Sequence, residues 1–124
     1  MTYGIGTDIV KISHLKPFAE TLNDPFIQKT YTEKELKLIL SREVPLNSLA
    51  TRFAGKEAVF KSLSISGDHV RLNEIEILEN DFGQPQVILH GYIKKLAEER
   101  NIQKILISLS YDTDYAVAYA NSIT

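Results

Sequence analysis

A single acid interrupts an apolar stretch near the N-terminus, in the segment GTDIV that ends at Val10. With the alternation of a β-strand, Asp8 shares one face with Gly4, Gly6 and Val10. A buried charge without a partner is costly, so this carboxylate is expected to be paired, to bind a metal or to stay open to solvent. The two glycines leave room on that face for a group to approach the carboxylate. The simpler alternative is a partly exposed acid on an edge strand.

A second group of charges lies in the segment RFAGKEAVFKSL, residues 52–63. Glu57 and Lys61 are four residues apart, so on a helix they lie on the same face. Arg52 and Lys56 add two cations within about three turns. A Glu–Lys pair at this spacing is common on helix surfaces and contributes little, so a solvated ion pair remains an alternative. The many large apolar residues of the segment instead favour a mostly covered helix, where charges need specific partners.

Other familiar patterns do not reach the spacing that their chemistry requires. The N-terminal glycines lack the third glycine and the following helix of a dinucleotide-binding fingerprint, and no P-loop lysine follows them. His14, His69 and His90 are scattered and show no metal-ligand spacing. Ser108 and Ser110 alternate on one predicted strand, but no histidine and acid accompany them in the order of a known serine hydrolase. The sequence therefore shows no nucleophile of its own.

The composition indicates an ordinary globular domain that spans residues 1–124. The formal net charge of −2 indicates no overall basic field for nucleic-acid binding. There is no cysteine, which excludes disulfides, thiolate metal sites and a cysteine nucleophile. No apolar run approaches the ~20 residues of a membrane span, and no signal peptide is evident, so no membrane association and a cytoplasmic location are expected.

Hydrophobic periodicity and turn signals predict the elements that must position these residues. Strands are predicted at residues 2–10, 74–79, 86–90, 104–111 and 115–123. Helices are predicted at residues 14–22, 32–43, 46–64 and 91–101. Ser13 is expected to cap the first helix, Thr32 and Glu35 form a capping-box pattern at the second, and Gly67 and Asp68 are expected to end the third. The order of elements predicts an α+β fold, with a largely antiparallel sheet and a long helix packed on it.

Taken together, five segments resemble the holo-acyl-carrier-protein synthase family, the 4′-phosphopantetheinyl transferases of bacterial fatty-acid synthesis. They are YGIGTDIV at 3–10, YTEKEL at 31–36, RFAGKEAVFKSL at 52–63, GQP at 83–85 and SLSYDTDYAVAYA at 108–120. The most specific parts are G-x-D near the N-terminus and F-x-x-K-E-A-x-x-K on the long helix. The resemblance implies transfer of 4′-phosphopantetheine from coenzyme A to a serine of an apo acyl carrier protein, with release of 3′,5′-ADP. The nucleophile would then belong to the partner.

The resemblance also implies roles for the charged residues. Asp8 and Glu57 would hold Mg²⁺, which prefers a few oxygen ligands completed by water and substrate phosphate. Glu57, directly or through a water on the metal, would be the base for the serine proton. Lys61 would contact the same phosphates and help 3′,5′-ADP to leave.

The nucleotide of coenzyme A would be contacted by Arg52, by the turn Gly83, Gln84 and Pro85, and by the segment that ends at Tyr111. The turn residues are first of all turn formers. Members of the family often carry a histidine where this chain has Tyr111. Tyrosine can hydrogen-bond and stack, but it does not titrate near neutrality, which puts any acid–base role of that position in doubt.

The resemblance further implies a homotrimer with active sites between subunits. The segment YAVAYA alternates large residues with alanines and could pack on both faces, although ordinary core packing explains the same pattern. The acidic carrier protein would need a local basic surface. The candidates lie on or beside the first short helix: Lys11, His14 and Lys16. The alternative is that these are plain solvated residues.

Two other functions remain open. One is a non-catalytic module that binds a carrier protein or a nucleotide on the same fold, which only Tyr111 favours. The other is an unrelated small α+β protein, which would have no affinity for coenzyme A.

Overall fold

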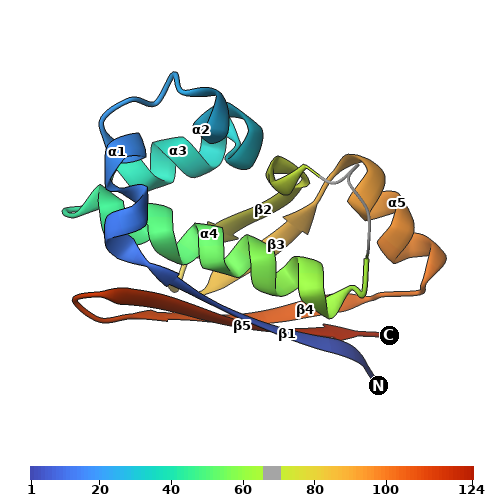
Figure 1. Cartoon of the computed structure of the whole chain (residues 1–124). Coiled ribbons are helices and arrows are strands. Elements are labelled where there is room, and N and C mark those ends of the chain that lie inside the picture. Colours follow the sequence, from blue (N-terminus) through green and yellow to red (C-terminus); the bar gives the residue numbers. More distant parts are fainter. Residues whose placement is uncertain (66–70) are drawn as a thin grey trace.

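Helix α4, Pro45–Ser62, runs through the centre of the molecule, and the other elements pack around it (Figure 1). The arrangement comes from a computed structural model that describes residues 1–65 and 71–124. The other helices and strands, in chain order, are β1 (Thr2–Lys11), a 3-10 turn (Ile12–Leu15), α1 (Lys16–Ala19), α2 (Pro25–Thr30), α3 (Glu33–Leu40), a second 3-10 turn (Leu72–Glu74), β2 (Ile75–Glu79), β3 (Pro85–Leu89), α5 (Gly91–Glu99), β4 (Lys104–Tyr111) and β5 (Tyr115–Ile123).

The strands form two antiparallel sheets. β5 is the central strand of a three-stranded sheet in the order β1–β5–β4, and β2 pairs with β3 in a separate hairpin. The three-stranded sheet lies along one side of α4, while α1, α2 and α3 gather at one end of this helix (Figure 1). The predicted α+β fold with antiparallel pairing and a long packed helix is confirmed, with the strands divided between two sheets.

The two faces of β5 have opposite characters. Its alanines, Ala116, Ala118 and Ala120, are fully buried, whereas its large residues alternate with them on the other face and are exposed. Small side chains on the inner face let α4 lie close to the sheet, because helix-to-sheet distance depends on the side chains between them. In the isolated chain, therefore, this strand packs on one face only.

Helix α4 and strand β1 pack closely at two glycines of the strand. A Cβ atom at Gly6 would lie 2.0 Å from the backbone oxygen of Ala58, and one at Gly4 would lie 2.2 Å from that of Ser62. Ser122 of β5 joins the same place, because its hydroxyl donates to the Ser62 carbonyl at 2.8 Å. The room expected beside Asp8 is thus occupied at both glycines by the backbone of α4.

Local signals explain where the predicted helices differ from the observed ones. The region expected to be one helix over 14–22 is a 3-10 turn followed by the single turn of α1, and Ser13 lies inside the 3-10 turn rather than capping a helix. Helix α2 lies between the first two predicted helices, where no helix is predicted; it begins at Asp24 and Pro25. They are a start signal: the Asp24 carboxylate accepts a hydrogen bond from the Phe26 N–H at 2.8 Å, and proline occupies the first turn.

The capping box of α3 is confirmed, with both reciprocal bonds between Thr32 and Glu35 present. Helix α3 ends at Leu40 and α4 at Ser62, slightly earlier than predicted. The expected stop at Gly67 and Asp68, and His69 as well, lie outside the described residues. Within the described ranges, no helix has the length and apolar character needed to cross a bilayer.

The contact between α4 and β1 predicts that Gly6→Ala destabilises the protein. The added methyl meets backbone, which cannot rotate away, so we expect a loss of about 1–3 kcal/mol in the free energy of unfolding. Gly55→Ala is the matched comparison, because its Cβ would meet only side-chain carbons of Ile77, Ile107 and Leu109, and alanine favours the helix by up to ~1 kcal/mol. Urea unfolding measures both. If Gly55→Ala lost as much free energy of unfolding as Gly6→Ala or more, the backbone contact at Gly6 would not explain the loss.

Candidate functional site

Each cation of α4 reaches an acid on a different element. Arg52 binds Glu79 of β2, and Lys56 binds Glu35 of α3. Lys61 binds Asp8 of β1. The sequence places the three cations near Glu57 of the same helix. In the fold each of them instead forms an ion pair with an acid of another element.

The ammonium of Lys61 lies against the strand that carries Asp8. Its Nζ donates to the backbone oxygen of Thr7 at 2.9 Å and to Asp8 Oδ1 at 3.3 Å. The Lys61 side chain is 51% exposed and that of Asp8 is 17% exposed. The cation is therefore held next to the carboxylate while it remains open to solvent, so an anionic ligand can reach it.

Glu57 lies in the same electrostatic environment. Partial burial raises the pKa of its carboxyl, the negative charge of Asp8 raises it further, and the positive charge of Lys61 opposes both effects. Asp8, which is distant in sequence from Glu57 and Lys61, thus comes together with them where α4 crosses β1. The fold assembles the predicted metal-binding and phosphate-binding residues in one place.

This donor set fits a Mg²⁺ ion. Two carboxylates near enough to raise a pKa by repulsion are stabilised when a divalent cation lies between them. Within the described part of the chain, no group of three or more His, Cys, Asp or Glu side chains could hold a metal. A metal here would therefore complete its shell with water and ligand oxygens, as Mg²⁺ prefers and as a structural zinc site does not.

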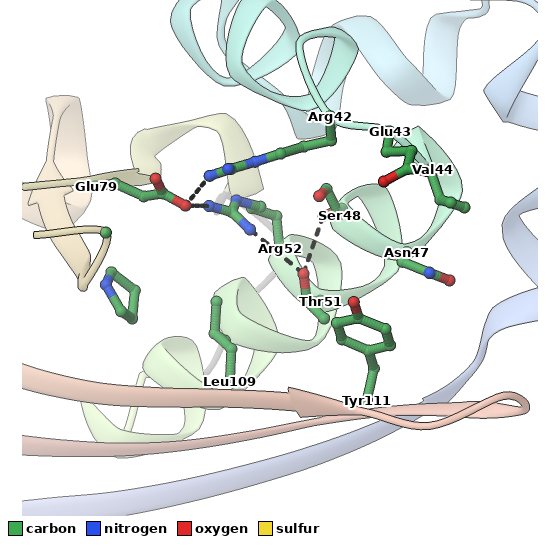
Figure 2. Close-up of a pocket in the computed structure, with 12 residues that line it drawn as sticks. Arg42, Glu43, Val44, Asn47, Ser48, Thr51, Arg52, Glu79, Leu109 and Tyr111 are labelled. Atoms are coloured by element: carbon green, nitrogen blue, oxygen red, sulfur yellow. Dashed lines mark hydrogen bonds and ion pairs between the residues drawn. The ribbon is translucent and has the colours of Figure 1, made fainter.

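A pocket of about 570 Å³ lies between α4, β4 and the turn that joins β2 to β3. Arg42 and Arg52 both point to Glu79 in this pocket (Figure 2). Arg52 is almost fully buried; burial lowers the pKa of its guanidinium, and Glu79 partly offsets this. Its Nε is buried and has no hydrogen-bond partner among the residues that the structure describes. Two guanidinium groups that share the Glu79 carboxylate leave N–H donors for an anion, although Glu43 also lines the pocket.

Most of the predicted nucleotide contacts line this pocket. Arg52, Gly83, Pro85 and Tyr111 are among the lining residues, and the Tyr111 ring extends from the end of β4 toward the first turns of α4 (Figure 2). Gln84 does not line it. Its side-chain oxygen accepts from Asn80 at 2.9 Å, and the residue lines a separate cavity along β4. Gln84 thus lies outside this pocket, and the contact of its turn with the nucleotide stays a prediction.

Sequence reasoning missed several residues of this pocket. They are Arg42, Glu43, Val44, Asn47, Ser48, Thr51, Glu79 and Leu109. Ser48 lies three residues before Thr51 and four before Arg52, so this polar face of the helix could have been found from i, i+3 and i, i+4 spacing. Arg42 and Glu79 lie on other elements, and their meeting with Arg52 depends on the fold.

The outer face of the three-stranded sheet is exposed and largely apolar. Its large residues, with exposures between 38% and 63%, are Tyr3, Ile5, Ile9, Leu106, Tyr115, Val117 and Tyr119. On the ladder between β1 and β5, Ile9 lies opposite Val117. A continuous apolar face of this kind on a small domain is typical of a protein–protein interface.

Comparisons with known proteins agree with this geometry. Residues 4–120 match the 4′-phosphopantetheinyl transferase superfamily. A holo-acyl-carrier-protein synthase from Caldanaerobacter subterraneus is 34% identical over 96% of this chain and 93% of its own. The crystal structure of such a synthase from Neisseria meningitidis has a TM-score of 0.88 and 30% identity, and covers 100% of both chains. The synthase from Helicobacter pylori in complex with coenzyme A has a TM-score of 0.81 and 27% identity, with 96% of this chain and 99% of that chain covered.

The shared environment of Asp8, Glu57 and Lys61 predicts how the pKa of Glu57 responds to substitution in metal-free protein. Asp8→Asn removes a negative neighbour and should lower the pKa of Glu57, while Lys61→Met removes a positive one and should raise it. Carboxyl ¹³C NMR titration of Glu57 measures both shifts. Glu98→Gln on the exposed side of α5 is the control and should change nothing. If Asp8→Asn left the Glu57 titration where it was, the two carboxylates would not share a site.

Proposed function

This chain belongs to the 4′-phosphopantetheinyl transferase superfamily, and we propose that it transfers 4′-phosphopantetheine from coenzyme A to a serine of an apo acyl carrier protein, with Mg²⁺ bound and 3′,5′-ADP released. It is an enzyme of the holo-acyl-carrier-protein synthase type. The observation that carries the proposal is the meeting of Asp8 from β1 with Glu57 and Lys61 from α4. We propose that residues 1–124 form one catalytic domain, which works in the cytoplasm in fatty-acid synthesis.

In this proposal Asp8 and Glu57 hold the Mg²⁺. When bound, the ion supplies charge neutralisation on the pyrophosphate of coenzyme A. The serine oxygen of the carrier forms a bond to the phosphorus that bears pantetheine, and the bond from that phosphorus to the leaving oxygen of 3′,5′-ADP breaks. Glu57, directly or through a water on the ion, would take the serine proton.

Lys61 stabilises the charge that develops on the phosphates. Its ammonium is half exposed and is held by Thr7 and Asp8, so it is oriented toward the carboxylate pair before the substrate binds. A preorganised cation of this kind needs little rearrangement during the reaction, which is the main source of electrostatic catalysis.

We propose that the pocket beside α4 takes the nucleotide of coenzyme A. Arg42 and Arg52 would bind phosphate oxygens there, and Tyr111 would stack on or hydrogen-bond to the adenosine. Gly83 and Pro85 would form a wall of the pocket. The part of Gln84 would be limited to shaping this turn, in which its own N–H donates to the Asn80 side chain at 3.0 Å.

A homotrimer is proposed from the exposed apolar face of the sheet. A chain of 124 residues gains much from covering such a face, because a small domain buries only a modest core by itself. Light scattering should give three times the mass of one chain. Ile9→Glu, which adds a charge to this face, should give a smaller species if the face is the interface.

A basic docking surface for the carrier is proposed at Lys11, His14 and Lys16. All three are exposed, and Lys11 lies three residues beyond Asp8 on β1. Contacts between exposed charges are screened by salt over about 8–10 Å, so raised ionic strength should weaken carrier binding more than coenzyme A binding. Equal salt sensitivity of the two dissociation constants would argue against this surface.

A non-catalytic binding module on the same fold is less well supported. It would have no need for a half-buried carboxylate beside a second acid, an arrangement that repulsion makes unfavourable without a bound cation. Tyr111 in place of a histidine does not alter this, because the tyrosine lies in the nucleotide pocket rather than beside the carboxylates.

Incubation with apo acyl carrier protein, coenzyme A and Mg²⁺ tests the proposal. Intact-mass spectrometry should show a carrier heavier by one phosphopantetheine group. Asp8→Asn and Glu57→Gln should each reduce the transfer rate by at least about a hundredfold, because each removes a metal ligand, while Glu98→Gln should transfer normally. An unmodified carrier after reaction with the wild-type enzyme would refute the activity. Near-normal rates for either variant at limiting Mg²⁺ would refute the metal assignment alone.

Lys61→Met should fold normally and lose turnover. An exposed ion pair contributes only ~0.2–1 kcal/mol of stability, whereas removing a cation that stabilises the transition state costs ~3 kcal/mol, or about a hundredfold in rate. Lys61→Arg should recover part of the loss, because a planar guanidinium does not replace a point charge. Turnover at saturating substrates and a thermal melt distinguish a catalytic role of Lys61 from a surface role. Lys95→Met on α5 is the control and should leave both unchanged. Normal turnover of Lys61→Met would return Lys61 to a surface role.

A further inference from the structure

Lys56 has no exposed surface, although it neighbours Glu57 in the sequence. Its ammonium lies 2.6 Å from Glu35 Oε1, 2.5 Å from the backbone oxygen of Ile75 and 3.2 Å from that of Leu72. An ammonium has three N–H bonds, and three acceptors surround this one. The end of the side chain is therefore held from three directions, by α3, by β2 and by the turn before β2.

Glu35 is equally buried, and both of its carboxylate oxygens accept hydrogen bonds. Oε1 accepts from Lys56 and from the Thr32 N–H at 2.9 Å, while Oε2 accepts from the Ile77 N–H at 2.8 Å. The same carboxylate thus completes the capping box of α3, fixes the edge of β2 and neutralises Lys56. None of the roles proposed for the reaction uses either residue.

Stability alone is a poor explanation for such a pair. Removing two charges from water carries a large desolvation cost, and apolar residues of similar volume are often at least as stable. A buried ion pair does differ from an apolar contact in one respect: its geometry is directional, so it favours one arrangement of the joined elements.

The arrangement that this pair favours is the rotation of α4 about its own axis. Successive residues of a helix differ by about 100°, so Lys56 and Ala58 lie on nearly opposite sides, with Glu57 between them. Ala58 is the residue whose backbone oxygen faces Gly6 of β1. The helix is thus held by β1 on one side and by the ion pair on the other.

We propose that the Lys56–Glu35 pair is a positioning element that sets the rotation of α4 and thereby places Glu57 and Lys61 against Asp8; this inference rests on the proposed function. Side chains end about 5–6 Å from a helix axis, so a rotation of about 20° moves a carboxylate by about 2 Å. Misplacement by about 1 Å can cost a hundredfold in rate. Loss of the pair should therefore affect the metal-binding residues even where the protein remains folded.

The double variant Lys56→Met/Glu35→Leu tests this, because it replaces both ions with apolar side chains of similar volume and leaves no uncompensated charge. The Thr32 and Ile77 N–H groups lose the carboxylate that they bind, so we expect a cooperative melt at a lower Tm than that of the wild type. We also expect a kcat at least tenfold lower at saturating substrates, and Mn²⁺ binding at least fivefold weaker by EPR in the absence of substrates. Ile93→Val in the core contact of α5 is the control for lost stability, and should lower Tm without changing kcat or Mn²⁺ affinity.

A stable double variant with wild-type kcat and Mn²⁺ affinity would overturn the inference and leave the pair as a stability element. If the double variant does not fold, Glu35→Gln is measured instead. The glutamine amide has one oxygen and one NH₂ group, so its NH₂ must face one of the donors that bind the carboxylate in the wild type, and the contact is disturbed. A wild-type kcat and a wild-type Mn²⁺ affinity in Glu35→Gln would also overturn the inference. Failure of the wild type to modify the carrier would refute the proposed function, whereas the Mn²⁺ measurement still decides the positioning role.

Discussion

The contact between α4 and β1, made by backbone against backbone at Gly4 and Gly6, is the constraint on which the rest of the structure depends. No side chain separates the two elements there, so the helix cannot shift outward without losing this contact or inward without a clash. The buried alanines of β5 extend the same close packing across the sheet. One consequence is mechanical, because the central helix is fixed against the sheet. The other is chemical, because residues of α4 come within reach of Asp8.

Helix α4 carries three cations that differ in exposure to solvent and therefore in their access to a ligand. The Lys56 side chain is 0% exposed and is held by three acceptors, so it can orient the helix but cannot meet a ligand. The Arg52 side chain is 7% exposed and faces a pocket beside Glu79, where it can exchange one anion for another. The Lys61 side chain is 51% exposed and lies beside Asp8, where a phosphate can approach. One helix thus combines a buried ion pair, a cation that lines a pocket and a half-exposed cation beside an acid.

The carboxylate site is unfavourable by itself, and the fold maintains it. Partial burial and the nearness of Asp8 both disfavour the charged form of Glu57, an arrangement that a cation and a phosphate-containing ligand would stabilise. The exposed apolar face of the three-stranded sheet is a second unsatisfied feature of the isolated chain. The proposed Mg²⁺ and coenzyme A would account for the first feature, and the proposed homotrimer for the second.

Periodicity and turn signals predict the strands, the three longer helices and the faces of these elements, but not the short helices between β1 and α3. Periodicity predicted every strand to within about two residues, and spacing alone placed Glu57 and Lys61 on one helix face. The residues that carry the family resemblance identified Asp8 before its surroundings were known. The ion-pair partners follow from the packing of distant elements: Glu35 binds Lys56, and Glu79 binds Arg52. The same packing places the backbone of α4 against the two glycines of β1. The reason is physical. Side-chain direction along one element follows from its helical or strand period, whereas a contact between elements depends on how closely and at what rotation they pack, and that is set by many distant residues at once.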